Sequence, residues 1–328
     1  MKFFITAAFA AAAALACGAA AAQSVTLNVG HTLAPDSHYM VATNKMAEIA
    51  ASKSKGQIKI NVFPQSQLGG EVKMIQAART GGLDMFITAQ APLTNTIKAY
   101  SLFDMPYLFD SVEQANKVLL GSVGREFLDM LPKHNLVGLG WLSVMERNVF
   151  SSKPIRNDKD MAGMKLRVMQ SPGYVKAYES FGSQPTPMAY GDVYMSLQQG
   201  VVDGADTSPD QFVMDKFIEV SKYYNLTKVH YLPALLIIGK PSWDKLSADH
   251  KKILQDSASE ALAESRTYYR KSYDESIANM KKAGVQVIES NAGIMKQTSS
   301  KVNEALLAAI PDGKALFQKV QDAKSAAK

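Results

Sequence analysis

Apolar residues follow two spacings along this chain, and the two alternate. Residues 25–29 and 58–63 show the period of two that is typical of a half-buried strand. Residues 39–53 and 71–79 show the three- and four-residue spacing of a helix with one apolar face, and residues 83–88 return to a strand pattern. Strands that alternate with helices in this way indicate crossover connections and a largely parallel sheet.

A second set of elements begins near residue 163 and predicts a second lobe. Two apolar runs, 138–151 and 231–239, connect the sets, the first leaving the first lobe and the second returning to it. Two such crossings form a hinge that lets the lobes close around a ligand. The elements predicted for the second lobe are strands at 166–169, just after 201–203 and at 285–288, and helices at 174–181 and 192–199.

The longest helical pattern runs from Ser247, a good helix cap, to Lys282. At a rise of 1.5 Å per residue such a helix spans roughly 50 Å, which exceeds one small lobe, so we expect it to lie across both. A coiled coil is the alternative, but the apolar positions do not keep a heptad over three repeats.

Composition supports two lobes and limits the classes of ligand. The chain has 328 residues, 47% of them hydrophobic, which is enough to bury a core divided between two domains. Its formal net charge is +6 at pH 7. Lys and Arg are interspersed with Asp and Glu, which argues against nucleic-acid binding, whereas a modest positive field suits the capture of small anions.

Residues 1–22 are expected to be a secretory signal peptide. Lys2 gives a positive start, an apolar run over 3–16 follows, and three alanines precede Gln23. The run is shorter than the ~20 residues that span a bilayer, so a membrane anchor is the weaker interpretation. The single cysteine, Cys17, lies in this segment, where lipidation is a further alternative. The rest of the chain has no thiol for a disulfide, a nucleophile or a metal.

A short apolar strand that contains an arginine is the first candidate for chemistry. The run 163–168 reads Gly-Met-Lys-Leu-Arg-Val, so Lys165 and Arg167 share one face of the strand. A guanidinium among apolar neighbours costs free energy unless its donors meet a partner. That partner is either a carboxylate of the protein or the carboxylate of a ligand, which a guanidinium can bind with two parallel hydrogen bonds.

Four further segments carry a family resemblance. They read Phe-Pro-Gln-Ser-Gln-Leu-Gly-Gly-Glu at 63–71, Leu-Phe-Asp-Met-Pro-Tyr-Leu-Phe at 102–109, Gly-Ser-Gln-Pro-Thr-Pro-Met at 182–188, and Asp-Val-Tyr-Met-Ser-Leu-Gln-Gln-Gly-Val-Val-Asp-Gly at 192–204. Together they resemble the DctP-type substrate-binding proteins of TRAP (tripartite ATP-independent periplasmic) transporters over about residues 26–285. The resemblance implies a periplasmic-binding-protein-like α/β fold, with two α/β lobes of mixed sheets, a hinge and an interlobe cleft.

The patterns and the resemblance together set lobe boundaries. We expect lobe I over residues 24–146, completed by about 236–270, and lobe II over 147–235, completed by about 275–310. Residues 311–328 are expected to form a peripheral C-terminal segment.

The resemblance also gives roles to polar side chains. Arg167 matches the family's principal carboxylate-binding arginine, and Arg147 matches a second arginine of many members, with a pair to Glu146 as its alternative. Tyr190 lies where relatives place an aromatic that packs on the ligand, and a core aromatic is its alternative. Thr207 departs from the family, which commonly has asparagine in this region, and threonine offers fewer hydrogen bonds.

Three first-lobe residues follow strands at the expected cleft. Glu71 and Gln90 can receive ligand hydroxyls, although Glu71 can instead be a first-turn helix charge. His31, with His38, lies at the cleft edge or is structural. No metal and no cofactor is expected, because His31, His38 and Asp36 form no familiar ligand set.

The resemblance thus implies a monomeric periplasmic solute-binding protein rather than an enzyme. It captures an organic acid, either a sugar acid such as a uronate or a C4-dicarboxylate, through an arginine–carboxylate contact. The resemblance implies delivery to the small and large membrane subunits of a TRAP transporter. The alternatives are a binding component of another importer or receptor, and an exported hydrolase or lyase, for which the chain has no Gly-x-Ser-x-Gly or His-Glu-x-x-His motif.

Overall fold

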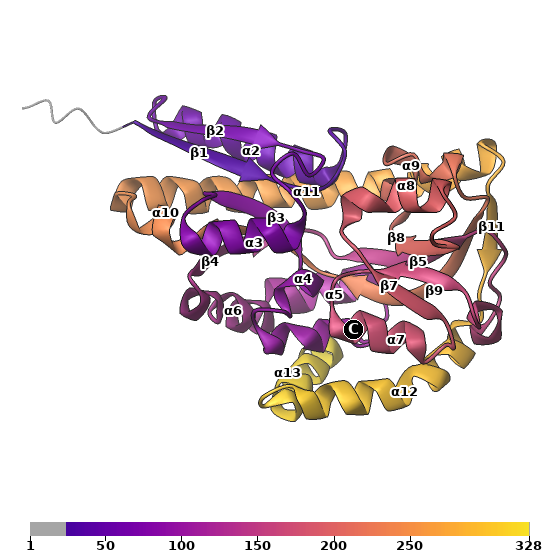
Figure 1. The fold of residues 1–328 in the computed structure, drawn as a ribbon. Coiled ribbons are helices and arrows are strands. Elements are labelled where there is room, and N and C mark those ends of the chain that lie inside the picture. Colours follow the sequence, from indigo (N-terminus) through magenta and orange to yellow (C-terminus); the bar gives the residue numbers. More distant parts are fainter. Residues whose placement is uncertain (1–23, 328) are drawn as a thin grey trace, which may run out of the picture.

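The computed structural model describes residues 24–327, which fold into two α/β lobes that lie side by side (Figure 1). The expected signal peptide, residues 1–22, and Cys17 lie outside the described residues. Each lobe is built on one sheet, with helices packed against it. The two-lobe α/β fold expected from the sequence is confirmed.

The sheet of lobe I has five strands in the order β2-β1-β3-β10-β4. β1 runs parallel to β2 and β3, whereas β10 runs antiparallel to both β3 and β4. The expectation of a largely parallel sheet is therefore met only by the first three strands, because β10 enters from the other lobe. The strands are β1 (Val25–Gly30), β2 (Ile58–Phe63), β3 (Met85–Ala89), β4 (Leu136–Trp141) and β10 (Ala234–Gly239).

The sheet of lobe II has six strands in the order β11-β9-β5-β8-β6-β7. Its edge pairs, β6 with β7 and β9 with β11, are parallel, and its central strand β5 is antiparallel to both neighbours. The strands are β5 (Met145–Ser151), β6 (Lys165–Val168), β7 (Gln184–Pro187), β8 (Gly204–Thr207), β9 (Tyr223–Leu232) and β11 (Gln286–Glu289).

Helices and short 3-10 turns (η) connect and cover the strands. In lobe I these are α2 (His38–Lys53), α3 (Glu71–Thr80), α4 (Gln90–Leu93), η1 (Lys98–Asp104), α5 (Val112–Leu120), α6 (Ser122–Leu128), η2 (Leu131–His134) and α10 (Lys240–Asp244). In lobe II they are η3 (Asp158–Met161), α7 (Pro172–Glu179), η4 (Tyr190–Asp192), α8 (Val193–Gln198), α9 (Pro209–Met214) and η5 (Phe217–Glu219).

The long helix α11 (Ala248–Lys282) lies across both lobes, as its length predicts (Figure 1). The Ser247 side chain caps it by accepting a hydrogen bond from the His250 N–H, 3.1 Å away. The helix packs on α2 of lobe I and on α9 of lobe II. Between them the Tyr269 hydroxyl accepts from the N–H of Glu146, so the helix also holds the start of β5 at the first crossing.

The lobes share a core where the chain crosses between them. β4 leads to β5 through residues 142–144, and β9 leads to β10 through Pro233. One buried apolar cluster continues through this region and includes Ile87 of β3, Leu232 at the end of β9 and Val168 of β6. The two crossings therefore form the packed hinge that the sequence predicts.

The C-terminal segment corrects one expectation. After α12 (Ala292–Ala309), residues 313–326 form helix α13, which packs against α5 and η1. Leu316 and Val320 are buried in the same apolar cluster as Phe103 and Phe127 of lobe I. Residues 311–328 were expected to be peripheral, but α13 is part of the lobe I core because its apolar side covers these aromatic rings.

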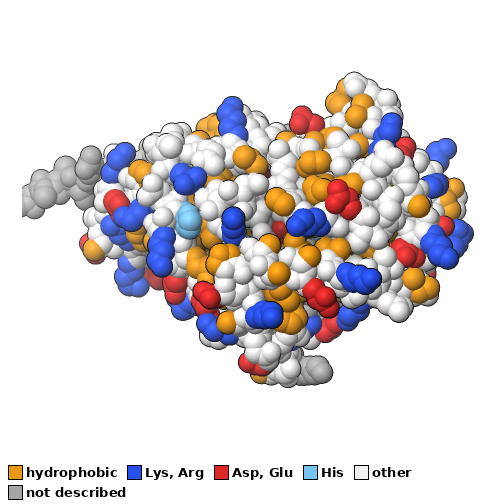
Figure 2. All heavy atoms as spheres, turned by 60° about the horizontal axis from the view of Figure 1, so that its bottom comes forward, with side chains coloured by type: hydrophobic (Ala, Val, Ile, Leu, Met, Phe, Trp, Pro, Cys, Tyr) orange, Lys and Arg blue, Asp and Glu red, His pale blue; other side chains and the backbone are white. Residues whose placement is uncertain are grey.

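The surface matches the charge pattern of the sequence. Figure 2 shows the face that carries α12 and α13, where Lys and Arg side chains are spread out with Asp and Glu between them. Among residues 24–327, no helix is both long enough and apolar enough to cross a membrane.

The packing of α13 predicts that Leu316→Ala lowers the free energy of unfolding by about 2 to 3 kcal/mol, because a buried leucine is replaced by a cavity. Leu120→Ala is the control, since Leu120 is 54% exposed, and it should change stability by less than about 0.5 kcal/mol. Urea unfolding measures both. Equal effects of the two substitutions would show that α13 does not belong to the core.

Candidate functional site

A small cavity of about 20 Å³ lies between the lobes. Its walls come from the carboxyl ends of β1 and β3 and the start of α3 on one side, and from β5, the end of β6 and α9 on the other. Ligands of open α/β sheets bind at such strand ends. The lining residues are Thr32, Leu33, Tyr39, Glu71, Ala89, Met145, Arg147, Met169, Tyr190, Gln211 and Leu232.

Each guanidinium nitrogen of Arg147, on β5, has an acceptor within the protein. Its Nε donates to Asp206 Oδ2 at 2.9 Å, its Nη2 to the Asp206 carbonyl, and its Nη1 reaches Gln211 Oε1 at 3.4 Å. Burial alone would lower the pKa of Arg147, but the adjacent Asp206 carboxylate raises it well above its usual range. The pair that we considered with Glu146 is therefore replaced by a buried pair with Asp206.

Arg167 on β6 is buried differently. Its Nε and Nη2 both donate to one acceptor, the carbonyl oxygen of Met188, at 3.2 and 2.9 Å. Its Nη1 is buried and has no hydrogen-bond partner among residues 24–327. Burial lowers the pKa of Arg167; the charge of Asp206 opposes this shift and that of Arg147 adds to it. Arg167 therefore has a buried donor to offer to an anion.

Tyr190 stands beside this guanidinium. The ring centroid lies 5.7 Å from Arg167 Cζ, and the hydroxyl donates to Asp215 Oδ2 at 2.6 Å. Burial raises the pKa of Asp215 to about 7. The ring also meets Phe217 edge to face at 5.9 Å, so Tyr190 both lines the cavity and packs on the lobe II core. Its packing on Phe217 matches the core role that the sequence left as the alternative, and contact with a ligand stays a prediction.

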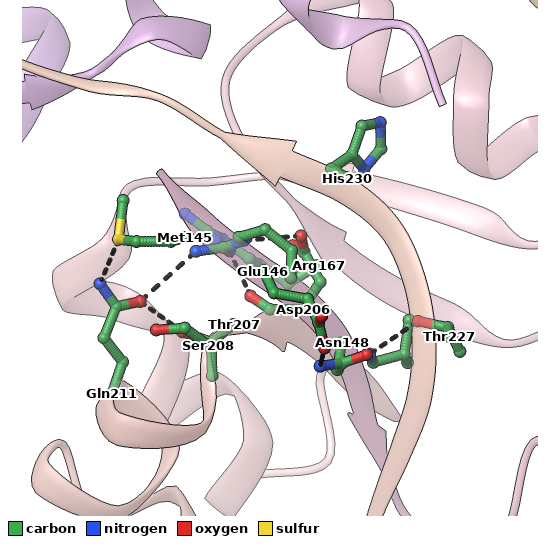
Figure 3. A network of polar contacts seen from close by, with 12 residues as sticks. Met145, Glu146, Asn148, Arg167, Asp206, Thr207, Ser208, Gln211, Thr227 and His230 are labelled. Atoms are coloured by element: carbon green, nitrogen blue, oxygen red, sulfur yellow. Dashed lines mark hydrogen bonds and ion pairs between the residues drawn. The ribbon is translucent and has the colours of Figure 1, made fainter. Parts of the chain in front are cut away.

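Thr207 supports the cavity wall from behind. Its hydroxyl donates to Gln211 Oε1 at 2.6 Å, and Gln211 Nε2 points to the sulfur of Met145 (Figure 3). Gln211 Oε1 also accepts a hydrogen bond from Arg147 Nη1, so Thr207 and Arg147 donate to the same amide oxygen. Thr207 fixes the orientation of Gln211, and it is Gln211 that lines the cavity.

Glu71 faces the cavity from lobe I. Its Oε1 accepts hydrogen bonds from the Ala89 N–H at 2.7 Å and from the Thr88 hydroxyl at 3.3 Å. Burial raises the pKa of Glu71, while these bonds and the charges of Arg167 and Arg147 oppose the shift. One wall of the cavity therefore carries a carboxyl group and the other carries Arg147, whereas Arg167 is buried next to Tyr190 and does not itself line the cavity.

Gln90 and His31 are buried, but neither lines the cavity. Gln90 Nε2 donates to Asp104 Oδ1 at 3.0 Å. The His31 ring meets Tyr39 edge to face at 5.9 Å, and burial, with the charge of His38 adding, lowers its pKa to about 4.

Two important residues were missed by sequence reasoning. Asp206 is a buried acid in the strand Gly-Ala-Asp-Thr, so the argument that singled out Arg167 also applied to it. Gln211 lies on α9, which begins two residues after Thr207, the last residue of β8. Neither resembles a familiar motif, which is why only the observed contacts identify them.

The charged side chains of the cavity do not form a metal site. Within residues 24–327, no group of three or more His, Cys, Asp or Glu side chains is placed to hold a metal ion. Guanidinium and amide donors on one wall and a carboxyl acceptor on the other suit an organic anion with hydroxyl groups.

Comparison with known proteins finds a family that matches this sequence and this fold. The DctP model, "Bacterial extracellular solute-binding protein, family 7", matches residues 29–310. A sugar acid binding protein from Advenella mimigardefordensis, solved with galactonate, superposes with a TM-score of 0.90 at 28% identity, covering 93% of this chain and 99% of that one. A TRAP periplasmic solute-binding protein from Polaromonas, bound to D-erythronate, has a TM-score of 0.88 at 32% identity and coverages of 91% and 98%.

A curated relative is similar over nearly its whole length. The 2,3-diketo-L-gulonate-binding periplasmic protein YiaO of Escherichia coli is 29% identical over 313 residues, which is 94% of this chain and 95% of that protein.

The buried pair predicts that Asp206→Asn lowers the free energy of unfolding by about 3 kcal/mol, because Arg147 loses its counter-charge in the interior. Asp256→Asn is the matched control: Asp256 also pairs with a cation, Lys252, but on the surface. The control should leave the urea midpoint unchanged. If Asp206→Asn also leaves it unchanged, Arg147 does not depend on this carboxylate.

Proposed function

The chain belongs to the DctP family of bacterial extracellular solute-binding proteins, and we propose that it captures a sugar acid by binding the carboxylate to Arg167. The family is the solute-binding family of TRAP transporters, so the resemblance seen in the sequence is confirmed. Proteins of this family bind solutes and are not enzymes. The observation that carries the proposal is the buried, unpartnered Nη1 of Arg167 within the described residues.

The two arginines have different parts in binding. Arg147 has a counter-charge in Asp206 and keeps its position without a ligand. Arg167 forms no ion pair with a protein carboxylate in the described part of the chain, and only one carbonyl neutralises part of its buried charge. A ligand carboxylate would supply the missing charge and accept from Nη1, which makes Arg167 the main contact and Arg147 a fixed positive background.

Glu71 favours a particular kind of acid. A carboxyl group on the opposite wall accepts hydrogen bonds from ligand hydroxyls but repels a second ligand carboxylate. The ligand is then a monocarboxylate with a hydroxylated chain, rather than a C4-dicarboxylate. Galactonate, D-erythronate and 2,3-diketo-L-gulonate, the compounds named for the related proteins, are all monocarboxylates with hydroxyl groups.

The remaining contacts complete the site. Tyr190 lines the cavity next to Arg167, and Gln211, held by Thr207, offers its amide to the ligand. Gln90 and His31 act indirectly, through the residues in front of them. Cleavage after residue 22 places the mature chain in the periplasm, the compartment of its family, and the monomeric, loaded protein docks on the small and large membrane subunits of a TRAP transporter.

A binding test of the wild-type protein checks the ligand class. Galactonate, D-glucuronate and D-erythronate are titrated while thermal unfolding is followed, with succinate as the dicarboxylate. A ligand at ~100 times its Kd adds roughly 2.7 kcal/mol of stability, which appears as a raised midpoint. Arg167→Ala should weaken binding roughly 100-fold without loss of fold. Lys165→Ala, exposed on the same strand, is the control, and equal affinities in the two variants would contradict the proposal.

Glu71 generates a separate prediction about selectivity. Glu71→Gln keeps the shape of the side chain and the hydrogen bond from Ala89 but removes the charge. The ratio of succinate affinity to galactonate affinity should therefore rise at least roughly ten-fold over the wild type. Calorimetric titration of both acids measures the ratio. A ratio that stays at the wild-type value would show that Glu71 does not select against a second carboxylate.

A further inference from the structure

The two lobes meet at a buried cluster beside the cavity. Ser171, the cap residue of α7 in lobe II, donates its hydroxyl hydrogen to the carboxylate of Asp104, at the end of η1 in lobe I. The Thr94 hydroxyl lies 3.0 Å from the same Ser171 oxygen. Next to it, Asn95 Nδ2 donates to the carbonyl of Gln170 at 2.7 Å. Polar groups of lobe I thus hold two consecutive residues of lobe II.

We propose that Asp104 and Ser171 form a latch between the lobes, and that this pair of positioning residues sets how long a bound sugar acid is retained. The inference rests on the proposed function for its ligand, but the contact itself does not depend on it. Opening the cleft has to break this contact, because its two halves belong to different lobes.

The contact is built to be close and dry. Asp104 is fully buried, and Ser171 is only 2% exposed. Gly173, in the first turn of α7, makes the approach possible: a Cβ there would lie 2.4 Å from both Cβ and Oδ2 of Asp104. Gln90 Nε2 donates to the other carboxylate oxygen. The Asp104 carboxylate therefore has donors on both oxygens only while α7 is in place.

The latch is connected to the candidate ligand contact through a short segment. Arg167 lies on β6 four residues before Ser171, and Met169 between them lines the cavity. A movement of Ser171 away from Asp104 therefore moves the strand end that carries Arg167. Gln90 also has a role in the latch, because its amide donates a hydrogen bond to Asp104 rather than to the ligand.

The charges around the latch give it a pH dependence with a defined sign. Burial raises the pKa of Asp104 from 3.8 to about 7, although Ser171 and Gln90 oppose the shift. The titratable groups that face it are Tyr174 of α7 and His230 of β9, whose Nε2 lies 3.1 Å from the Asp104 carbonyl. Separation of the lobes would admit water and bring the pKa of Asp104 back down, so the closed state holds the proton and closure weakens as pH rises towards 7 and slightly above.

His230 limits the useful pH range. Burial lowers its pKa from 6.5 to about 4, so opening at acidic pH would let it take up a proton and would oppose the effect of Asp104. Above pH 6.5 an exposed histidine is mostly neutral in either state. Between pH 6.5 and 8.5 Asp104 therefore dominates, and galactonate affinity should fall by up to about four-fold in the wild type.

The first experiment measures galactonate dissociation by stopped flow for Asp104→Ala, Ser171→Ala and the double variant. Each single substitution should raise the dissociation rate constant by roughly ten-fold, because each removes the buried hydrogen bond between the lobes. The double variant should add little, because both act on one contact, and this comparison separates the latch from the helix cap that Ser171 also provides. Asp129→Ala, at an exposed acid of lobe I, is the control.

The second experiment needs no ligand, so failure of the proposed function cannot be mistaken for failure of the latch. Fluorophores on Lys59→Cys in lobe I and Lys165→Cys in lobe II, both exposed, report the distance between the lobes. Asp104→Ala removes the acceptor for Ser171 as well as the titrating group, so it should lengthen the mean distance and remove its dependence on pH between 6.5 and 8.5. Wild-type protein that binds no sugar acid overturns the proposed function alone. Unchanged distances, or unchanged dissociation rates in a protein that binds, overturn the latch.

Discussion

The buried guanidinium of Arg167 is the constraint on which the account depends. Lobe II holds two buried arginines, but only Arg147 has a carboxylate partner, Asp206. Arg167 shares one carbonyl between two nitrogens, and its third nitrogen has no partner within residues 24–327. A buried cation with an unused donor is stable only if the surrounding structure holds it there, and it gains when an anion arrives.

The fold supplies that support. β6 is a four-residue strand between β7 and β8, so the Arg167 backbone is fixed on both sides. The hinge core and α11 hold the two lobes in register, which places the carboxyl group of Glu71 opposite the arginines. The cavity thus has a positive wall from one lobe and an acceptor wall from the other. The proposed ligand, an anion with hydroxyl groups, matches both walls.

Much of this arrangement could be predicted from the sequence where one segment decides the outcome. The cap at Ser247 and a long run of helical spacing gave α11, and an arginine within an apolar strand indicated a buried cation. Contacts between segments that are distant in the sequence were harder to predict. The antiparallel entry of β10 depends on the hinge, and the burial of Val320 depends on aromatic residues about 200 positions earlier, so neither leaves a local signal.

The site shows the same division. Arg147, Tyr190 and Glu71 line the cavity, whereas Arg167, Gln90 and His31 do not, since a sequence pattern indicates a region and not the direction of a side chain. Asp206 and Gln211 could not be assigned from the sequence, because their roles depend on partners that are distant in the chain.

The most direct measurement is a crystal structure with bound galactonate. The account predicts its carboxylate within about 3 Å of Arg167 Nη1; a carboxylate at the Glu71 wall, with a hydroxyl against Arg167, would contradict it.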